Sequence, residues 1–163
     1  KGFAMTGWRL GYALGNKEIL KQMIKIHQYA IMCAPTVSQY AAIEAMYNGD
    51  QDVIYMRESY NQRRRFLYHE LQRLGLPCFL PEGAFYMFPD IREFGMTSED
   101  FALDLLKEEK VAVVPGSAFG DCGEGFIRIS YAYSIEELKE ALLRIERYLN
   151  RKRSQKTESP KHV

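Results

Sequence analysis

Several features that would place the chain in a common class of protein are missing or rare. No apolar run approaches the ~20 residues that a membrane-spanning helix needs, and the start lacks the basic flank and apolar block of a signal peptide. The 22 basic and 21 acidic residues leave a net charge of +1, so charge gives no reason to expect binding to nucleic acid or to a membrane. The three cysteines, Cys33, Cys78 and Cys122, are widely spaced and form no CxxC pair. We therefore expect reduced thiols in a cytoplasmic protein and no metal site.

What the chain does have is enough apolar material for a core. Its 163 residues, 47% of them hydrophobic, suffice for one domain or for parts of two. Apolar residues at helical spacing, together with capping and turn residues, predict mainly helices in the first part of the chain. The expected elements are a short strand at 9–14, a helix from Asn16 that ends before Pro35, a helix from Thr36 to Asn48, and a long helix from Asp50 or Asp52 to about residue 75.

After Gly75 the pattern changes to short apolar stretches separated by proline and glycine, which is typical of strands. The expected strands are 78–80, 84–88, 111–114 and 126–132, with a helix capped by Ser98 that runs to Glu109 and a last helix that runs to about Asn150. Ser134 and Glu137 have the spacing of a capping box at the start of that last helix. The tail, residues 151–163, is charged and contains Pro160, so we expect it to be disordered.

This order of elements predicts the fold class and the domain organisation. Helices followed by a strand-rich segment indicate an α/β chain in which the end of one domain is joined by the long helix to a small α/β domain. We expect residues 1–59 to belong to the first domain and the linking helix to cover about 50–75. Residues 60–150 should form the small domain. The run 63–65 of three arginines in the long helix permits a nucleic-acid interpretation, but a solvated helix face is favoured.

The most informative stretch is formed by the first eleven residues, Lys1-Gly2-Phe3-Ala4-Met5-Thr6-Gly7-Trp8-Arg9-Leu10-Gly11. A lysine amine that loses its proton in a desolvated pocket can form a Schiff base with an aldehyde, and an arginine fork binds a phosphate. Pyridoxal phosphate carries an aldehyde and a phosphate on one ring, so Lys1 and Arg9 are suited to bind these two groups of that cofactor. The alternative is a surface strand with a solvated Arg9.

The stretch resembles the lysine motif of the class I and II aminotransferases, S-K-x-F-x-M-T-G-W-R-x-G, whose serine would stand before Lys1. The resemblance implies that Lys1 holds the cofactor and moves the substrate proton, and that Arg9 binds the cofactor phosphate. It also implies a large domain with a mostly parallel sheet and a small C-terminal domain that closes on the substrate. Because nothing precedes Lys1 and there is no initiator methionine, we expect the chain to be the C-terminal part of a larger enzyme.

A second candidate residue is Arg128, which lies in the apolar stretch Phe126-Ile127-Arg128-Ile129-Ser130. Strand alternation puts Arg128 on one face with Phe126 and Ser130, and the two isoleucines on the other. A half-buried guanidinium is costly without an anion, and its planar fork matches the two oxygens of a carboxylate. From the local sequence alone, a substrate-binding arginine and an exposed arginine paired with a glutamate are equally supported.

The resemblance favours the first of these. The family carries an arginine in an R-x-S-x-A context after a P-G-x-x-F-G loop, which here is the segment 115–120, and this implies that Arg128 binds the substrate α-carboxylate. The segment 81–86 resembles the family's P-x-G-A-F-Y, in which Gly83 and Ala84 keep the backbone close to the substrate. We interpret Tyr86 as a core aromatic residue and assign it no chemistry.

Together these matches imply a transaminase that moves an amino group between an amino acid and a 2-keto acid through pyridoxal phosphate, as a homodimeric whole protein. The isolated chain should be inactive and bind the cofactor weakly, because the family places the acidic partner of the pyridine nitrogen upstream of the lysine. Residues 27–35 contain no arginine, which weakens an aspartate-only interpretation and slightly favours an apolar or aromatic amino acid.

Two other functions remain open for the whole protein. One is a carbon–sulfur lyase, or another enzyme that uses pyridoxal phosphate on the same scaffold. The other is an aminotransferase-like sensor domain of a transcription regulator.

Overall fold

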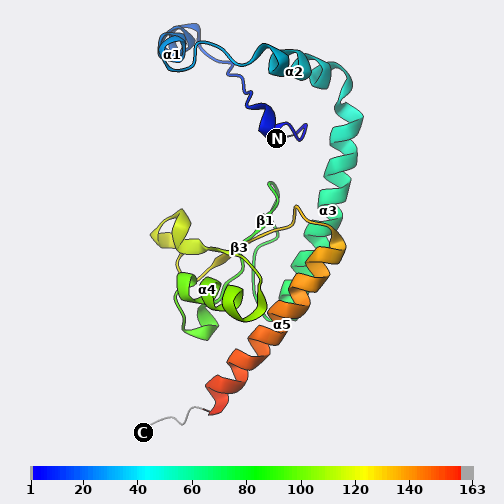
Figure 1. The fold of residues 1–163 in the computed structure, drawn as a ribbon, viewed down its shortest axis with the longest axis vertical. Coiled ribbons are helices and arrows are strands. Elements are labelled where there is room, and N and C mark those ends of the chain that lie inside the picture. Colours follow the sequence, from blue (N-terminus) through cyan, green and yellow to red (C-terminus); the bar gives the residue numbers. More distant parts are fainter. Residues whose placement is uncertain (1, 159–163) are drawn as a thin grey trace. The chain divides into compact units, whose positions relative to one another are not determined.

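The computed structural model describes residues 2–158, and Lys1 and residues 159–163 lie outside the described part. The contacts divide the chain into two compact units, residues 1–58 and residues 59–163, and the boundary falls within the long helix α3 (Figure 1). The elements of the first unit are a short 3₁₀ turn (Thr6–Trp8), α1 (Lys17–Ala30), α2 (Thr36–Asn48) and the first part of α3 (Asp50–Arg73). The second unit contains the rest of α3, β1 (Tyr86–Met87), α4 (Ser98–Glu109), β2 (Val114–Pro115), β3 (Ile127–Ser130) and α5 (Ile135–Glu158), with 3₁₀ turns at Arg92–Phe94, Gly116–Phe119 and Asp121–Gly123.

The helices of the first unit begin and end where the capping residues predict. The Asn16 side chain accepts a hydrogen bond of 2.8 Å from the backbone N–H of Glu18, which satisfies a free donor at the start of α1. Between α2 and α3, Gly49 leaves no room for a side chain, because an added Cβ would lie 2.5 Å from the Ala45 carbonyl oxygen and 3.0 Å from the Phe3 ring. This close contact holds the start of the chain against the junction of the two helices.

The strand expected at 9–14 does not form. Arg9 has a φ of +52°, in the left-handed region, and residues 10–16 have no regular structure. A strand needs a neighbour to accept and donate its backbone hydrogen bonds, and the described part of the first unit contains no strand to provide one. The apolar pattern of the segment was therefore not sufficient to make a strand.

The second unit contains a small antiparallel sheet in the order β1-β3-β2. Tyr86 of β1 lies opposite Ser130 of β3, and Val114 of β2 lies opposite Arg128. The expected strands at 84–88 and 126–132 are present but shorter than predicted, and the one expected at 78–80 is absent. The flanking Pro77 and Pro81 lack the N–H that a ladder needs, so this segment could not be extended at either end. The strand expected at 111–114 is shifted, because β2 shares only Val114 with it and includes Pro115, which was expected to end it.

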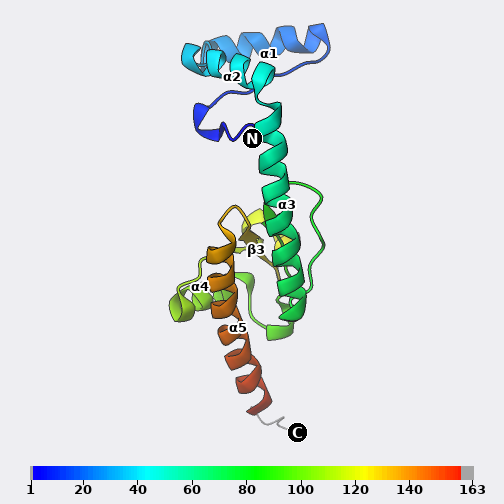
Figure 2. The same ribbon diagram turned by 90° about the vertical axis from the view of Figure 1, so that its right-hand side faces the viewer.

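The core of the second unit lies between one face of this sheet and three helices. Figure 2 shows α5 beside the second half of α3, and the Arg73–Glu146 ion pair of 2.7 Å joins these two helices. The buried residues come from α3, the loop that follows it, the sheet, α4 and α5. They are Leu67, Leu71, Leu74, Leu76, Met87, Ile91, Phe101, Leu105, Ile127, Ile129, Tyr131, Leu138, Leu142, Ile145, Tyr148 and Leu149. The isoleucines of β3 face this core, as the alternation predicted, and Arg128 is on the other, half-buried face.

The start of α4 differs by one residue from the prediction. Thr97, not Ser98, is the N-cap, and its side chain accepts a hydrogen bond from the Asp100 N–H. Ser98 is fully buried, and its hydroxyl instead accepts hydrogen bonds of 2.8 Å and 3.2 Å from the backbone N–H groups of Gly125 and Phe126. The serine thus fixes the chain just before β3.

The last helix confirms the predicted capping box but corrects the predicted tail. The Ser134 hydroxyl accepts from the Glu137 N–H at 3.2 Å, and the Glu137 carboxylate accepts from the Ser134 N–H at 3.2 Å. The helix continues to Glu158, so the expectation of disorder is wrong for residues 151–158. Its added turns make ion pairs with α4, among them Arg151–Glu109 at 2.6 Å, which local sequence does not reveal. The rest of the predicted tail, residues 159–163, lies outside the described residues.

Candidate functional site

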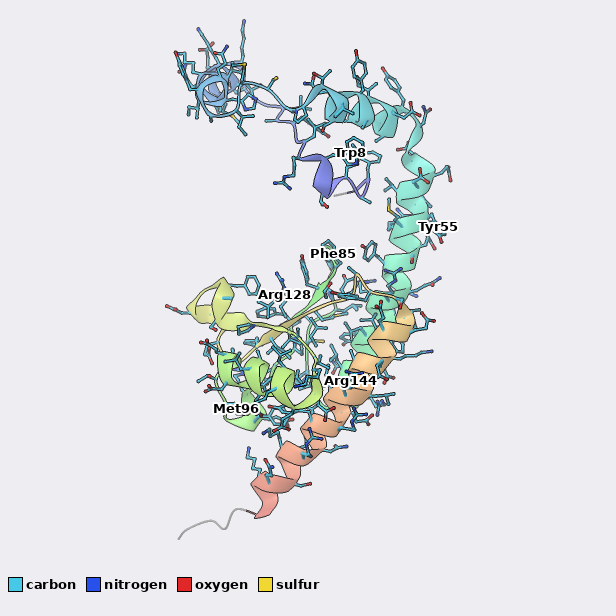
Figure 3. The ribbon with its side chains drawn as sticks, in the orientation of Figure 1. Trp8, Tyr55, Phe85, Met96, Arg128 and Arg144 are labelled. Atoms are coloured by element: carbon cyan, nitrogen blue, oxygen red, sulfur yellow. The ribbon has the colours of Figure 1, made fainter. Side chains whose placement is uncertain are left out.

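Arg9 is the one predicted cofactor residue that the structure places, since Lys1 lies outside the described residues. Arg9 follows the Thr6–Trp8 turn, and one guanidinium nitrogen donates to the Thr6 carbonyl oxygen at 3.0 Å. The turn is tied to α2 by Ser38, which is 3% exposed and whose hydroxyl donates to the Trp8 carbonyl oxygen at 2.8 Å. Trp8 projects from this turn in Figure 3. A left-handed φ at an arginine is uncommon and is often found at functional sites.

The residues around Arg9 form a hollow of about 480 Å³, lined by Ala4, Gly7, Trp8, Arg9, Pro35, Val37 and Ser38. Arg9 carries the only charge among these lining residues, and none of its recorded contacts within the described part is with a carboxylate. Ala4 and Gly7, which share this lining, add little side-chain bulk to it. The hollow has room for a phosphate group, which an arginine fork binds through paired charge-assisted hydrogen bonds.

Arg128, labelled in Figure 3, is half-buried on β3, and two aromatic rings lie close to its guanidinium. Its guanidinium carbon lies 4.2 Å from the ring centroid of Tyr86 and 4.8 Å from that of Phe119. Among the described residues no carboxylate lies within ion-pair distance of it, so the glutamate-paired alternative finds no partner there. The cation is left with rings for neighbours and with its N–H donors available.

Tyr86 was assigned no chemistry, yet its ring lies beside the Arg128 guanidinium. It is half-buried and does not belong to the core, so its interpretation as a core aromatic is wrong. The signal that could have found it is strand alternation. The register puts Tyr86 opposite Ser130, on the same face as Arg128, while the next residue, Met87, enters the core.

The turn that carries Phe119 is held by two glycines. A Cβ at Gly116 would lie 2.0 Å from the Gly123 carbonyl oxygen, and a Cβ at Gly123 would lie 2.1 Å from the Gly116 carbonyl oxygen. The Gly116 N–H also donates to the Phe126 carbonyl oxygen at 2.8 Å. Only glycine allows the two backbones to approach so closely, which fixes the turn beside the start of β3.

The segment before β1 is held by a buried tyrosine. The Tyr131 hydroxyl donates to the Ala84 carbonyl oxygen at 3.0 Å, and Ala84 has a φ of +61°. Burial raises the pKa of the Tyr131 hydroxyl above its usual range, so it remains a proton donor at neutral pH. The tyrosine therefore maintains a backbone conformation that alanine rarely adopts.

A larger hollow of about 800 Å³ borders Arg128 and Ser130. Its charged lining residues are balanced, with three carboxylates and three cations: Glu136, Glu137, Glu140, Lys110, Arg128 and Arg144. Much of its remaining wall is apolar side chains of 111–114 and of α5. Because the opposite charges balance, the lining does not select an anion, and we do not assign this hollow to the substrate.

Three other site types were sought in the described part of the chain. Residues 2–158 contain no group of three His, Cys, Asp or Glu side chains that could hold a metal ion. The helices within these residues include none that is long and apolar enough to cross a membrane. The cysteines are free thiols, with Cys33 and Cys122 exposed and Cys78 half-buried.

Comparison with known proteins agrees with the motifs. The family model described as aminotransferase class I and II matches residues 1–145. The Bacillus subtilis (strain 168) protein named "Putative aminotransferase YugH" is 56% identical over 93% of this chain and 39% of its own length. An aspartate aminotransferase of Pyrococcus abyssi (strain GE5 / Orsay) is 46% identical over 94% of this chain and 40% of its own length. The crystal structure of an aromatic aminotransferase from Pyrococcus horikoshii OT3 has a TM-score of 0.90 and 47% identity over 94% of this chain and 41% of its own. The chain thus spans about two fifths of the length of the relatives it matches.

Proposed function

Because the chain belongs to the class I and II aminotransferase family, we propose that the whole protein transfers an amino group between an amino acid and a 2-keto acid with pyridoxal phosphate. The observation that carries the proposal is the pair of arginines without a recorded carboxylate partner, Arg9 in the lining of a hollow with room for a phosphate and Arg128 beside two aromatic rings. An anionic group of the cofactor or of the substrate would neutralise the charge of each arginine.

The proposal gives each residue one task. Pyridoxal phosphate supplies an aldehyde that takes up the amino group and a ring that accepts negative charge from the substrate. Arg9 holds the phosphate, and Arg128 holds the α-carboxylate of the amino acid, so that the Cα–H bond is oriented. Lys1 removes the proton from Cα and returns it to the C4′ atom of the cofactor, as a general base and then a general acid.

The choice of amino acid is a further part of the proposal. The relatives and neighbours that resemble the chain are named for different amino acids, with aspartate and aromatic substrates at similar identity. Residues 27–35 provide no arginine for a second carboxylate, which supports an apolar or aromatic amino acid. A cytoplasmic location and a homodimeric whole protein belong to the same proposal, as does the inactivity of residues 1–163 alone.

The test is to trap the cofactor in the whole protein. Borohydride reduction in the presence of pyridoxal phosphate, followed by peptide mass mapping, should label the ε-amine of Lys1. A Lys1→Arg variant, purified and treated in parallel, is the matched control and should remain unlabelled at this peptide. A folded protein that carries no label on Lys1 would disprove the assignment of Lys1 and with it the transaminase.

A further inference from the structure

The arginines of the second unit differ in their partners. Several on the helices pair with acids, such as Arg73 with Glu146 at 2.7 Å and Arg147 with Glu109 at 2.9 Å. Arg64 of α3 instead donates to the Pro81 carbonyl oxygen at 2.7 Å. Arg128 is different, because no side-chain hydrogen bond or ion pair is recorded for it within residues 2–158, and its recorded contacts are the rings of Tyr86 and Phe119. Arg128 is thus a cation on a strand that has no acidic partner among the described residues.

Aromatic partners have a consequence that acids do not. A ring attracts a guanidinium through its quadrupole, and this contact uses the flat face of the cation. The N–H donors lie in the plane of the guanidinium, so they remain available for a bidentate carboxylate. A glutamate would bind those same donors and neutralise the charge before a substrate arrived. Tyr86 and Phe119 thus restrict the side chain while leaving its binding groups free.

Phe119 is itself held in place by other aromatic side chains and by its turn. Its ring meets Phe88 edge to face, with centroids 6.0 Å apart, and Phe88 stacks on Phe126 at 5.5 Å. The backbone contact between Gly116 and Gly123 fixes the turn that carries it. Such a constrained ring is suited to orienting a neighbour.

We propose that Phe119, with Tyr86, is a positioning residue that holds the Arg128 guanidinium in the orientation needed for the substrate carboxylate. The inference rests on the proposed function, because it takes Arg128 as the carboxylate-binding residue. Phe119 contributes through Arg128 and does not bind the carboxylate itself.

Phe119 is the better residue for a test, because its side chain is 50% exposed and contributes little to the core. Phe119→Leu removes the ring but keeps an apolar side chain, and Phe119→Tyr keeps the ring. Phe79 is 95% exposed in the same unit and has no recorded ring contact, so Phe79→Leu is the matched control for the same chemical change.

The experiment measures kcat and KM of the whole protein with the best amino acid from a panel of the common L-amino acids. We expect Phe119→Leu to raise KM roughly three- to tenfold, the range of a partly desolvated cation–π contact, with a smaller change in kcat. Phe119→Tyr and Phe79→Leu should keep the parent KM. In an Arg128→Lys background, which lacks the planar fork, Phe119→Leu should have no further effect on KM.

The possible outcomes separate a failure of the inference from a failure of the proposed function. If Arg128→Lys raises KM but Phe119→Leu does not, Phe119 has no positioning role. If Phe119→Leu raises KM by the same factor in both backgrounds, it acts independently of Arg128, and the inference is overturned. If Arg128→Lys leaves KM unchanged in a protein that traps the cofactor on Lys1, the carboxylate assignment of Arg128 is wrong and the inference falls with it.

Discussion

Residues 2–58 and residues 59–158 contain similar apolar side chains but differ in where those side chains lie. The buried hydrophobic residues of the described chain all belong to the second unit, from Leu67 onward. In the first unit, Leu14 and Tyr29 are 87% and 95% exposed, whereas Leu71 and Leu76 of the second unit are not exposed at all. Apolar composition therefore predicts material for a core, but only the second unit forms one from its own residues.

The two units also differ in the part of the proposed chemistry they carry. The first contains Arg9, in the lining of a hollow with room for a phosphate, and the second contains Arg128 on a sheet with a packed core beneath it. Arg128 is thus supported by the core of its own unit. Arg9 is held by a few contacts, such as the hydrogen bond of Ser38 to the turn before it, among side chains that are largely uncovered. Large exposed apolar surfaces normally contact another part of a protein.

The largest expected effect is on autonomous folding. A fragment of residues 59–163 should unfold cooperatively, because it contains the whole core, and a fragment of residues 1–58 should not. Circular dichroism during thermal unfolding of both fragments checks this. A cooperative transition in residues 1–58 alone would remove the difference between the units, and the 163-residue chain should melt with the second fragment.

A matched pair of substitutions sharpens the same comparison. In the 163-residue chain, Leu71→Ala should lower the free energy of unfolding by about 2–5 kcal/mol, because it leaves a cavity in the core. Leu14→Ala makes the same chemical change in the first unit, and there the loss should stay within about 0.5 kcal/mol, because the side chain is already in solvent. Urea unfolding of both variants measures the two values. Equal losses would mean that Leu14 is packed as tightly as Leu71.

The structural features that were predicted correctly from the sequence depend on residues close together along the chain. The Ser134–Glu137 capping box and the alternation around Arg128 are short-range patterns, and both are present. The strand expected at 9–14 failed because a strand depends on a partner, which no local pattern supplies. The helical turns at 151–158 were missed because their stabilising ion pairs reach about forty residues back along the chain, as with Arg151 and Glu109.

The candidate site shows the same difference between features that depend on nearby residues and features that depend on distant ones. Arg9 and Arg128 were named from motifs, and their surroundings support the proposal for each. The neighbours of Arg128 were not predicted, because Tyr86 comes from another strand and Phe119 from a turn closed by contacts between Gly116 and Gly123. Spatial neighbours of this kind need the register of the sheet. Lys1 remains a prediction.

The two arginines should differ in which ligand they affect. In the whole protein, Arg9→Gln should weaken binding of pyridoxal phosphate by about 2 kcal/mol, or roughly thirtyfold, the size of hydrogen bonds to a charged group. Arg128→Gln should raise the KM of the amino acid by a similar factor and leave cofactor binding unchanged. Cofactor titration by absorbance and steady-state kinetics separate the two constants. An exchange of these effects, or both effects from either variant, would contradict the division between the units.

The smallest effect concerns the ion pairs that hold the end of α5 on α4. The Arg151 and Arg147 guanidinium groups lower the pKa of the Glu109 carboxyl below its usual value of 4.5, and Glu109 is 8% exposed. Because the charged form is favoured in the folded state, its contribution to stability is complete above pH 4.5 and is lost as the pH falls through the lowered pKa.

Glu109→Gln should therefore lower the Tm of the 163-residue chain at pH 7, and the difference from the parent should shrink as the pH falls below 4.5. Differential scanning calorimetry between about pH 3 and about pH 7 measures this Tm difference, and the range extends below the usual pKa of a glutamate carboxyl. Glu82→Gln, at an exposed loop position with no recorded ion pair, should change Tm little across the range. If the Tm difference between Glu109→Gln and the parent stays constant as the pH falls, the shape of the Glu109 side chain, and not its charge, is what stabilises the protein. The end of α5 would then depend on packing, like the rest of the second unit.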